Sequence, residues 1–155
     1  MRPKPKASTG YEVRLLKAED LKRGFIETLE NLSNMGKLTP KTAAATFREI
    51  RRDPSRAVFV AVRVDGEVVG TTTLLLERKF IHGGGLVGHI EDVAVRQGRE
   101  GKGIGSALVS AAVDRARREG CYKCILDCKE ELVPFYSRLG FKRHEVEMRL
   151  DLAPA

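Results

Sequence analysis

The sequence predicts an α/β (α+β) fold in which a mixed β-sheet is flanked by helices. Two observations lead to this prediction. Some runs of the chain are rich in β-forming residues while others space their apolar residues at helical intervals, and the two kinds follow one another in the order β-α-α-β-β-β-α-β-α-β. The length of 155 residues suits one domain, which we assign to residues 11–155, behind a basic tail at residues 1–10 that we expect to be disordered.

The first third of the domain is predicted to hold one strand and two helices. Residues 11–16 (YEVRLL) form the strand, and apolar residues at helical spacing place a helix at residues 18–34, with Asp20 as its N-cap. The second helix begins at Thr39-Pro40, because threonine caps free N–H groups and proline suits the first helical position.

The middle of the chain is predicted to supply three strands. Residues 57–64 and 67–77 are β-rich runs joined by Asp65-Gly66, a pair typical of tight hairpins. Three glycines at 83–85 then interrupt the chain before a further strand at residues 87–95.

The last third is predicted to alternate helices and strands. A helix at residues 104–119 carries its apolar residues on one face and ends at Gly120, a natural C-cap. A strand at residues 122–128, a helix at 130–139 and a last strand at 141–150 complete the order.

A glycine-rich loop, RQGREGKGIG, joins the strand at 87–95 to the helix that follows it. Glycine lets main-chain N–H groups turn toward a ligand, and a helix N-terminus adds unpaired donors and a partial positive charge. The loop therefore suits an anion such as a pyrophosphate, with Arg96, Arg99 and Lys102 nearby. Taken alone, it is equally consistent with a solvated surface turn, and its spacing fits neither the Walker nor the dinucleotide-binding glycine pattern.

Composition narrows the class of partner and the location. The net charge of +7 favours anionic partners, but the absence of Trp and the 6% share of aromatic residues leave few platforms for stacking nucleic-acid bases, so we expect no nucleic-acid partner. No apolar run approaches the roughly 20 residues that span a bilayer, and without a secretory signal we predict a cytoplasmic protein with reduced thiols. Cysteines 121, 124 and 128 lie in an apolar run and lack a fourth ligand nearby, so we predict no metal site.

Several segments resemble one enzyme family. The segment EGKGIG at 100–105 resembles the acyl-CoA site of the GNAT superfamily of N-acetyltransferases, whose pattern is Gln/Arg-x-x-Gly-x-Gly/Ala, with Glu100 at the first position here. The segments GHIEDVAV (88–95), GCYKCILDC (120–128), FYSRLGF (135–141) and VEM (146–148) are together similar to the glucosamine 6-phosphate N-acetyltransferases of that superfamily. The resemblance implies a GNAT fold, with a mostly antiparallel sheet that splays at the acyl-CoA site. It also implies acetyl-CoA as co-substrate, a sugar phosphate as acceptor, and a homodimer with shared active sites.

The resemblance also implies roles for individual residues. The implied catalytic residues are Glu91, Asp92, Asp127 and Tyr136, where Glu91 is the base or positions water for the amine and Tyr136 faces the departing sulfur. A bulge at residues 91–93 would free the N–H of Val93 for the thioester carbonyl. The implied acetyl-CoA contacts are Val93, Ala94, Val95, Glu100, Gly101, Lys102, Gly103, Ile104, Gly105 and Tyr136. The implied sugar-phosphate contacts are Ser33, Lys79, His82, Glu91, Asp92, Tyr122, Lys123 and Arg149.

Some positions depart from the family pattern, and other functions remain open. Leu132 and Asp151 stand where the family has Asn and Arg, and Arg149 is the nearest substitute for that arginine. Tyr122 and Lys123 match residues that the family contributes across a dimer interface. One alternative is the same fold acting on another amine, in a protein or a polyamine, although a +7 chain suits an anionic acceptor better. Another is a basic nucleic-acid-binding module without catalysis.

Overall fold

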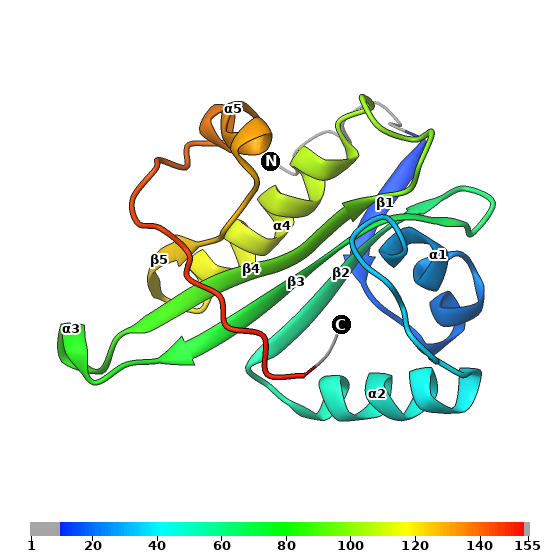
Figure 1. Ribbon diagram of the computed structural model, residues 1–155, viewed down its shortest axis with the longest axis horizontal. Coiled ribbons are helices and arrows are strands. Elements are labelled where there is room, and N and C mark those ends of the chain that lie inside the picture. Colours follow the sequence, from blue (N-terminus) through cyan, green and yellow to red (C-terminus); the bar gives the residue numbers. More distant parts are fainter. Residues whose placement is uncertain (1–9, 154–155) are drawn as a thin grey trace, which may run out of the picture. The chain divides into compact units, whose positions relative to one another are not determined.

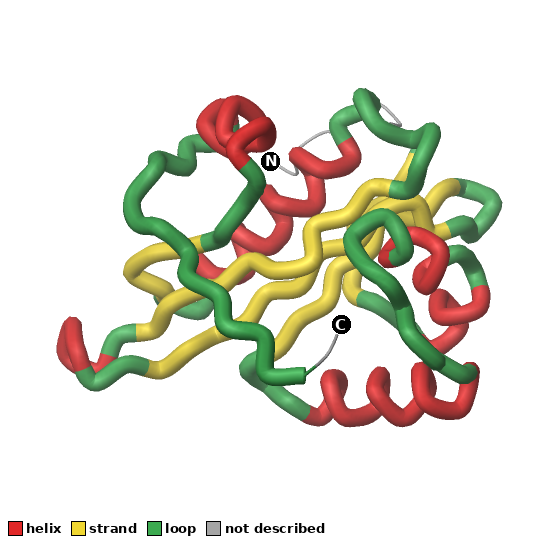
Figure 2. The backbone as a smooth tube through the Cα atoms, in the orientation of Figure 1, coloured by secondary structure: helices red, strands yellow, loops and turns green. Residues whose placement is uncertain are grey.

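The computed structural model describes residues 10–153, so the tail expected at residues 1–10 lies almost wholly outside the described residues. The chain divides into two compact units, residues 1–125 and residues 126–155. The first unit holds the sheet and the second a short helical segment followed by a long loop (Figures 1 and 2).

The first unit is built on one five-stranded sheet in the order β1-β2-β3-β4-β5. Its strands are β1 (Tyr11–Leu15), β2 (Arg56–Arg63), β3 (Val68–Arg78), β4 (Leu86–Val95) and β5 (Cys121–Ile125). The first four pair antiparallel with their sequence neighbours, and only β4 and β5 are parallel. The predicted mixed and mostly antiparallel sheet is therefore confirmed. So is the hairpin at Asp65-Gly66, where Gly66 has a φ of 85° and donates its N–H to the Arg63 carbonyl.

Helices cover both faces of this sheet, as Figure 1 shows. The longest helix, α4 (Ile104–Arg118), packs on one face, and a side chain at Gly70 of β3 would lie 2.7 Å from Ile104 and 2.8 Å from Leu108. The glycine therefore lets α4 approach the sheet closely. The other face is covered by α1 (Phe25–Leu29) and α2 (Pro40–Arg52), and α2 begins as predicted, with the Thr39 hydroxyl accepting a hydrogen bond from the Thr42 N–H.

The helix predicted at residues 18–34 is wrong. A 3-10 turn, η1 (Ala18–Lys22), is separated from the short α1 by Gly24, whose φ of 96° breaks the helix. Asp20 is not a helix N-cap. Its side chain is fully buried, and it accepts hydrogen bonds from the Arg14 guanidinium at 2.7 and 2.8 Å and from the Lys17 N–H at 2.8 Å. This tertiary ion pair holds the segment in a turn, and it overrides the helical spacing of the apolar residues.

A short helical turn, α3 (Ile81–Gly84), forms the tip between β3 and β4, where the sequence predicted a glycine break. At this tip the Phe80 side chain is fully exposed and Ile81 is largely exposed. The Lys79 N–H donates to the Gly85 carbonyl and closes the turn.

The second unit contains η2 (Glu130–Leu132) and α5 (Val133–Arg138), so the helix predicted at 130–139 is present in two pieces. Tyr136 is the buried residue of α5, and the Tyr136 ring lies edge-on to the rings of Phe135 and Phe141. The strand predicted at 141–150 is wrong, because the described residues after α5 pair with no strand. A strand exists only through hydrogen bonds to a neighbour, so an alternating sequence without a neighbour stays as loop. The strand predicted at 122–128 is also shorter, since β5 ends at Ile125.

Candidate active site

β4 carries a bulge opposite Thr72. Thr71 pairs with Ala94 and Thr73 pairs with Glu91, so the single residue Thr72 faces both Asp92 and Val93. Asp92 takes a φ of 50°, a left-handed conformation that aspartate tolerates better than most residues. The Thr72 hydroxyl donates to the Glu91 carbonyl at 3.2 Å. The predicted bulge is thus confirmed, and it takes the main chain of Asp92 and Val93 out of the regular ladder.

The sheet is open beside this bulge within the first unit. The parallel pairs between β4 and β5 run from Leu86–Cys121 to His89–Ile125. β4 then continues for six more residues, from Ile90 to Val95, beyond the end of β5. The bulged part of β4 therefore extends past its parallel neighbour, at the place where the sequence predicted a splayed sheet.

The glycine loop follows directly from this end of β4. Gly98, Gly101 and Gly103 have φ values of 79°, 75° and 75°, which residues with side chains rarely adopt. A side chain at Gly98 or Gly101 would meet nothing within 4 Å, so the main chain there borders open space. Gly103 is the N-cap of α4, whose first N–H groups have no partner within the helix. The loop has the conformation and setting of an anion site.

All the predicted acetyl-CoA residues except Tyr136 lie in one strand–loop–helix segment. Val93, Ala94 and Val95 end β4, Glu100 to Gly103 form the loop, and Ile104 and Gly105 start α4. The Ile104 side chain is buried in the core, so only its main chain is available to a ligand. Arg96 and Arg99, two of the basic residues near the loop, both donate hydrogen bonds to Glu67, at 2.6 and 3.4 Å.

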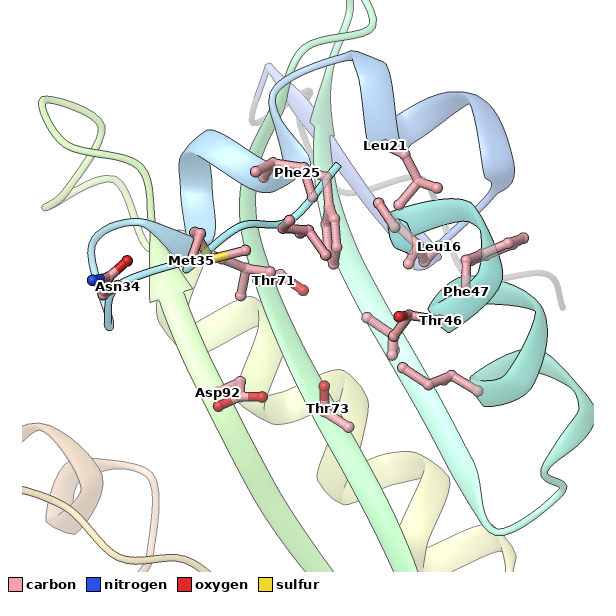
Figure 3. Close-up of a pocket in the computed structure, with 16 residues that line it drawn as sticks. Leu16, Leu21, Phe25, Asn34, Met35, Thr46, Phe47, Thr71, Thr73 and Asp92 are labelled. Carbon is pink, nitrogen blue, oxygen red and sulfur yellow. The ribbon is translucent and has the colours of Figure 1, made fainter. Parts of the chain in front are cut away.

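A cavity of about 340 Å³ lies on the α1–α2 face of the sheet (Figure 3). Its walls are mostly apolar, and Asp92 with Thr73 forms a polar end (Figure 3). The lining residues are Leu16, Leu21, Phe25, Ile26, Leu29, Asn34, Met35, Leu38, Ala43, Thr46, Phe47, Ile50, Val58, Thr71, Thr73 and Asp92. Ser33 is not among them, although its neighbours Asn34 and Met35 are. The sequence analysis missed Thr71 and Thr73, whose signal was the run of three threonines at residues 71–73 of β3.

Four predicted substrate residues gather at the other end of β4. His82 stacks on Tyr122, with ring centroids 4.2 Å apart, and the Lys123 ammonium lies 5.7 Å from the Tyr122 ring. Lys79 pairs with Glu77, which also contacts His89. Leu86 and Asp92 are six residues apart on one strand, or roughly 20 Å. Within one chain these side chains therefore do not meet the Asp92 carboxylate.

The remaining predicted residues, Asp127, Tyr136 and Arg149, belong to the second unit. Burial raises the pKa of Tyr136 to about 12, with smaller contributions from Cys128 and Asp127. The residue is therefore a neutral phenol at physiological pH. Arg149 is exposed and donates a hydrogen bond to Asp151 at 2.7 Å. The arginine and the residue that departs from the family pattern are thus paired with each other.

The three cysteines, all among the described residues, belong to no cluster arranged to hold a metal ion. Burial raises the pKa of Cys121, Cys124 and Cys128, so the three free thiols stay protonated at neutral pH. Within residues 10–153 no group of three or more His, Cys, Asp or Glu side chains is arranged to hold a metal ion. Over the same residues, no helix is long and apolar enough to cross a membrane.

Comparison with known proteins gives consistent matches. Residues 23–141 match the acetyltransferase (GNAT) family. The glucosamine 6-phosphate N-acetyltransferase of Trypanosoma brucei brucei is 39% identical over 142 residues, which cover 91% of this chain and 95% of the relative. The enzyme of the same name from Candida albicans is 38% identical over 140 residues, covering 90% and 94%. The crystal structure of glucosamine-6-phosphate N-acetyltransferase from Arabidopsis thaliana superposes with a TM-score of 0.90 at 32% identity, covering 92% of this chain and 99% of that one.

Proposed function

The chain belongs to the acetyltransferase (GNAT) family, and from this premise we propose that it acetylates D-glucosamine 6-phosphate with acetyl-CoA. The reaction transfers the acetyl group to the 2-amino group and gives N-acetyl-D-glucosamine 6-phosphate and CoA. The observation that carries the proposal is the bulge at Asp92-Val93. It places a main-chain amide outside the sheet ladder, next to a glycine loop suited to pyrophosphate and beside a cavity that ends in a carboxylate.

The donor site is proposed on the strand–loop–helix segment. The N–H groups of residues 98–105 and the N-terminus of α4 hold the pyrophosphate, since unpaired donors and the helix dipole both favour an anion. Val93, Ala94 and Val95 hold the acyl arm along the edge of β4, and Glu100 and Lys102 flank the phosphates. The Val93 N–H donates to the thioester carbonyl and stabilises the negative charge that develops there.

The acceptor is proposed to lie on the Asp92 side of β4. Glu91 and Asp92 hold the sugar, and Glu91 positions the amine or removes its proton. Asp127 orients the amine, and Ser33 contacts the sugar from the loop before α2. Much of the rate enhancement is assigned to holding donor and acceptor together, which contributes roughly 7–11 kcal/mol in well-oriented cases.

Tyr136 is proposed to act on the departing CoA sulfur. A phenol with a pKa of about 12 is a weaker acid than a thiol, whose usual pKa is about 8.5. This order favours a hydrogen bond from the phenol to the thiolate over full transfer of the proton. The reaction as proposed needs no acyl-enzyme and no metal.

We further propose that the enzyme is a homodimer with shared active sites. Lys79, His82, Tyr122 and Lys123 lie beside the first residues of β4, too far from the Asp92 carboxylate of their own chain to reach it, so we assign them to the partner's site. Arg149 is assigned to the sugar phosphate. The fully exposed Phe80 of the first unit, and separately the exposed apolar residues Val146, Met148, Leu150 and Leu152 of the second unit, each support a further contact surface. A cytoplasmic location is also part of the proposal, because the three thiols are free and free thiols suit a reducing compartment.

The test is a direct assay of CoA release with three acceptors: glucosamine 6-phosphate, a lysine-rich peptide and a polyamine. We expect turnover with the sugar phosphate only. Calorimetry with acetyl-CoA, followed by the sugar phosphate, measures each binding step. Turnover with the peptide or the polyamine, and none with glucosamine 6-phosphate, would show that the chain acetylates another amine. Tight, salt-dependent binding of nucleic acid, without binding of acetyl-CoA, would show that the chain is a nucleic-acid-binding module and not an acetyltransferase.

A further inference from the structure

One carboxylate joins the β2–β3 hairpin to the start of the glycine loop. Glu67 Oε1 accepts a hydrogen bond from Arg96 Nη1 at 2.6 Å, and its Oε2 accepts from Arg63 at 3.2 Å and from Arg99 at 3.4 Å. Arg63 ends β2, whereas Arg96 and Arg99 follow β4. We call these four residues the Glu67 cluster. Their side chains are about one-third exposed, so the pairs are partly shielded from water.

The hairpin holds Glu67 in place. The Arg63 N–H donates to the Glu67 carbonyl at 2.9 Å, and the Glu67 N–H donates to Asp65 Oδ1 at 3.1 Å. Val68, the next residue, starts β3 and is completely buried. The carboxylate therefore projects from a closed turn that is anchored on both sides.

The glycine loop, by contrast, has little internal support. Among the described residues, the main-chain hydrogen bond from Arg99 to the Arg96 carbonyl is the only one that joins two residues of the segment 96–103. Gly98, Gly101 and Gly103 give this segment a wide choice of conformations in the absence of other contacts. Side chains that fix its first residues therefore have a large influence on the positions of its N–H groups.

Arg96 also contacts the segment that leads into α1. A side chain at Gly24 would lie 2.6 Å from Arg96 Nη1 and 2.9 Å from the Val68 carbonyl, so the guanidinium fills the space beside this glycine. The Arg96 N–H donates to the Val69 carbonyl at 2.8 Å. Glu67 thus holds Arg96 between β3 and the start of α1, and it fixes the direction in which the loop leaves the sheet.

We infer that Glu67 is a positioning residue for acetyl-CoA binding, which it serves by holding Arg96 and Arg99 and, through them, the N–H groups of residues 98–103. This inference rests on the proposed function, because it takes the loop as the pyrophosphate site. Glu67 itself contacts neither substrate. Its loss affects how often the loop is in the binding conformation, and a ligand's apparent affinity falls with that fraction.

The test compares Glu67→Ala and Glu67→Gln with the control Glu119→Ala. Glu119 pairs with Arg115 at 2.6 Å at the far end of α4, and the exposure of these side chains is similar to that of the Glu67 cluster. Glu119→Ala therefore breaks an ion pair of similar exposure away from the loop. We expect Glu67→Ala to raise both the Kd and the KM for acetyl-CoA about tenfold. The values of kcat and of KM for glucosamine 6-phosphate should stay within about twofold. Glu67→Gln keeps one hydrogen-bond acceptor, so its Kd and KM for acetyl-CoA should lie between those of the wild type and those of Glu67→Ala. The values for Glu119→Ala should match the wild type.

Hydrogen exchange gives a second readout that does not depend on activity. Without ligand, the amides of residues 97–103 should exchange faster in Glu67→Ala than in the wild type or in Glu119→Ala. Unchanged exchange and an unchanged Kd in Glu67→Ala would overturn the inference alone. A wild-type chain that does not bind acetyl-CoA would overturn the proposed function and the inference with it. If Glu67→Ala fails to fold, Glu67→Gln replaces it in both measurements, with the same expected direction.

Discussion

The Asn31 side-chain amide donates a hydrogen bond of 2.7 Å to the main-chain carbonyl of Val95. Asn31 begins the connection between α1 and α2, whose later residues Asn34, Met35 and Leu38 line the cavity. Val95 is the last residue of β4, where the chain enters the glycine loop. The bond therefore ties the connection that lines the cavity ending at Asp92 to the strand that carries the proposed oxyanion donor.

Replacing Asn31 by Ala should weaken acceptor binding. A hydrogen bond of this kind contributes about 0.5–1.5 kcal/mol, so we expect KM for glucosamine 6-phosphate to rise roughly 2- to 10-fold. The KM for acetyl-CoA should change less. Steady-state kinetics against Glu30→Ala, a change at the exposed neighbouring position, provides the comparison. Equal values for all three proteins would show that the bond does not organise the cavity.

Substitutions of Asp92 distinguish the effect of its carboxylate on activity from the effect of its left-handed backbone conformation on stability. Asp92→Gly and Asp92→Asn both allow the positive φ, so both should keep the fold while kcat/KM for the sugar falls roughly 10- to 100-fold with the lost charged hydrogen bond. Asp92→Ala should show the same loss and should also be less stable by about 1–2 kcal/mol, because alanine disfavours this conformation. Kinetics and urea unfolding measure the two effects. Full activity in Asp92→Gly would remove the carboxylate from the mechanism.

Replacing Tyr136 by Phe should lower turnover more than it weakens acetyl-CoA binding. The phenol is proposed to stabilise the departing thiolate, an interaction that is present in the transition state and absent in the bound donor. We expect kcat to fall about 10- to 100-fold, with a Kd for acetyl-CoA within about threefold of the wild type. Phe135→Leu, at the neighbouring aromatic position, controls for packing. Unchanged kcat in Tyr136→Phe would exclude this role.

The raised pKa of Tyr136 predicts a loss of stability at high pH. Its pKa is about 12 in the folded protein and about 10 in an unfolded chain, so the folded state holds the phenolic proton more tightly. The resulting contribution to stability is complete below pH 10 and is lost as the pH rises from about 10 to 12. The free energy of unfolding should therefore fall more steeply over this range in the wild type than in Tyr136→Phe. Parallel slopes would contradict a buried, neutral phenol.

A charge placed on the exposed apolar side of residues 146–152 should disrupt the proposed dimer. Met148→Lys alters a side chain that is 90% exposed in the single chain, whereas Glu147→Lys introduces the same group at the adjacent position. Sedimentation should show monomers for Met148→Lys and dimers for Glu147→Lys. Activity should fall with the loss of the dimer, because the partner's residues then leave the site. A monomeric, fully active wild type would refute the shared site.

Local chemistry explains which parts of the fold were predictable. The hairpin at Asp65-Gly66 and the start of α2 at Thr39-Pro40 depend on residues adjacent in sequence, and both were predicted. The bulge at residues 91–93 was also predicted, but from the family resemblance, since strand alternation alone does not indicate it.

Tertiary contacts explain what the sequence did not predict. The turn at residues 18–24 depends on the buried pair of Asp20 with Arg14 and on Gly24 beneath Arg96. The Glu67 cluster was missed because Arg96 and Arg99 lie 29 and 32 residues away along the chain. The strand expected at 141–150 failed for a related reason, since alternation indicates a strand's faces but not the neighbour that it requires.

The order of the sheet has a consequence for how the chain assembles. From β2 to β4, each strand pairs with the strand made just before it, and these pairings can form while synthesis continues. The β2–β3 and β3–β4 closures are short, whereas the β1–β2 pair closes over residues 16–55. The β4–β5 pair must wait until α4 has been made and has crossed the sheet. β1 to β4 can therefore pair before β5 is made, and the opening beside β4 follows from the length of β5, which ends at Ile125 and leaves Ile90 to Val95 without a parallel neighbour.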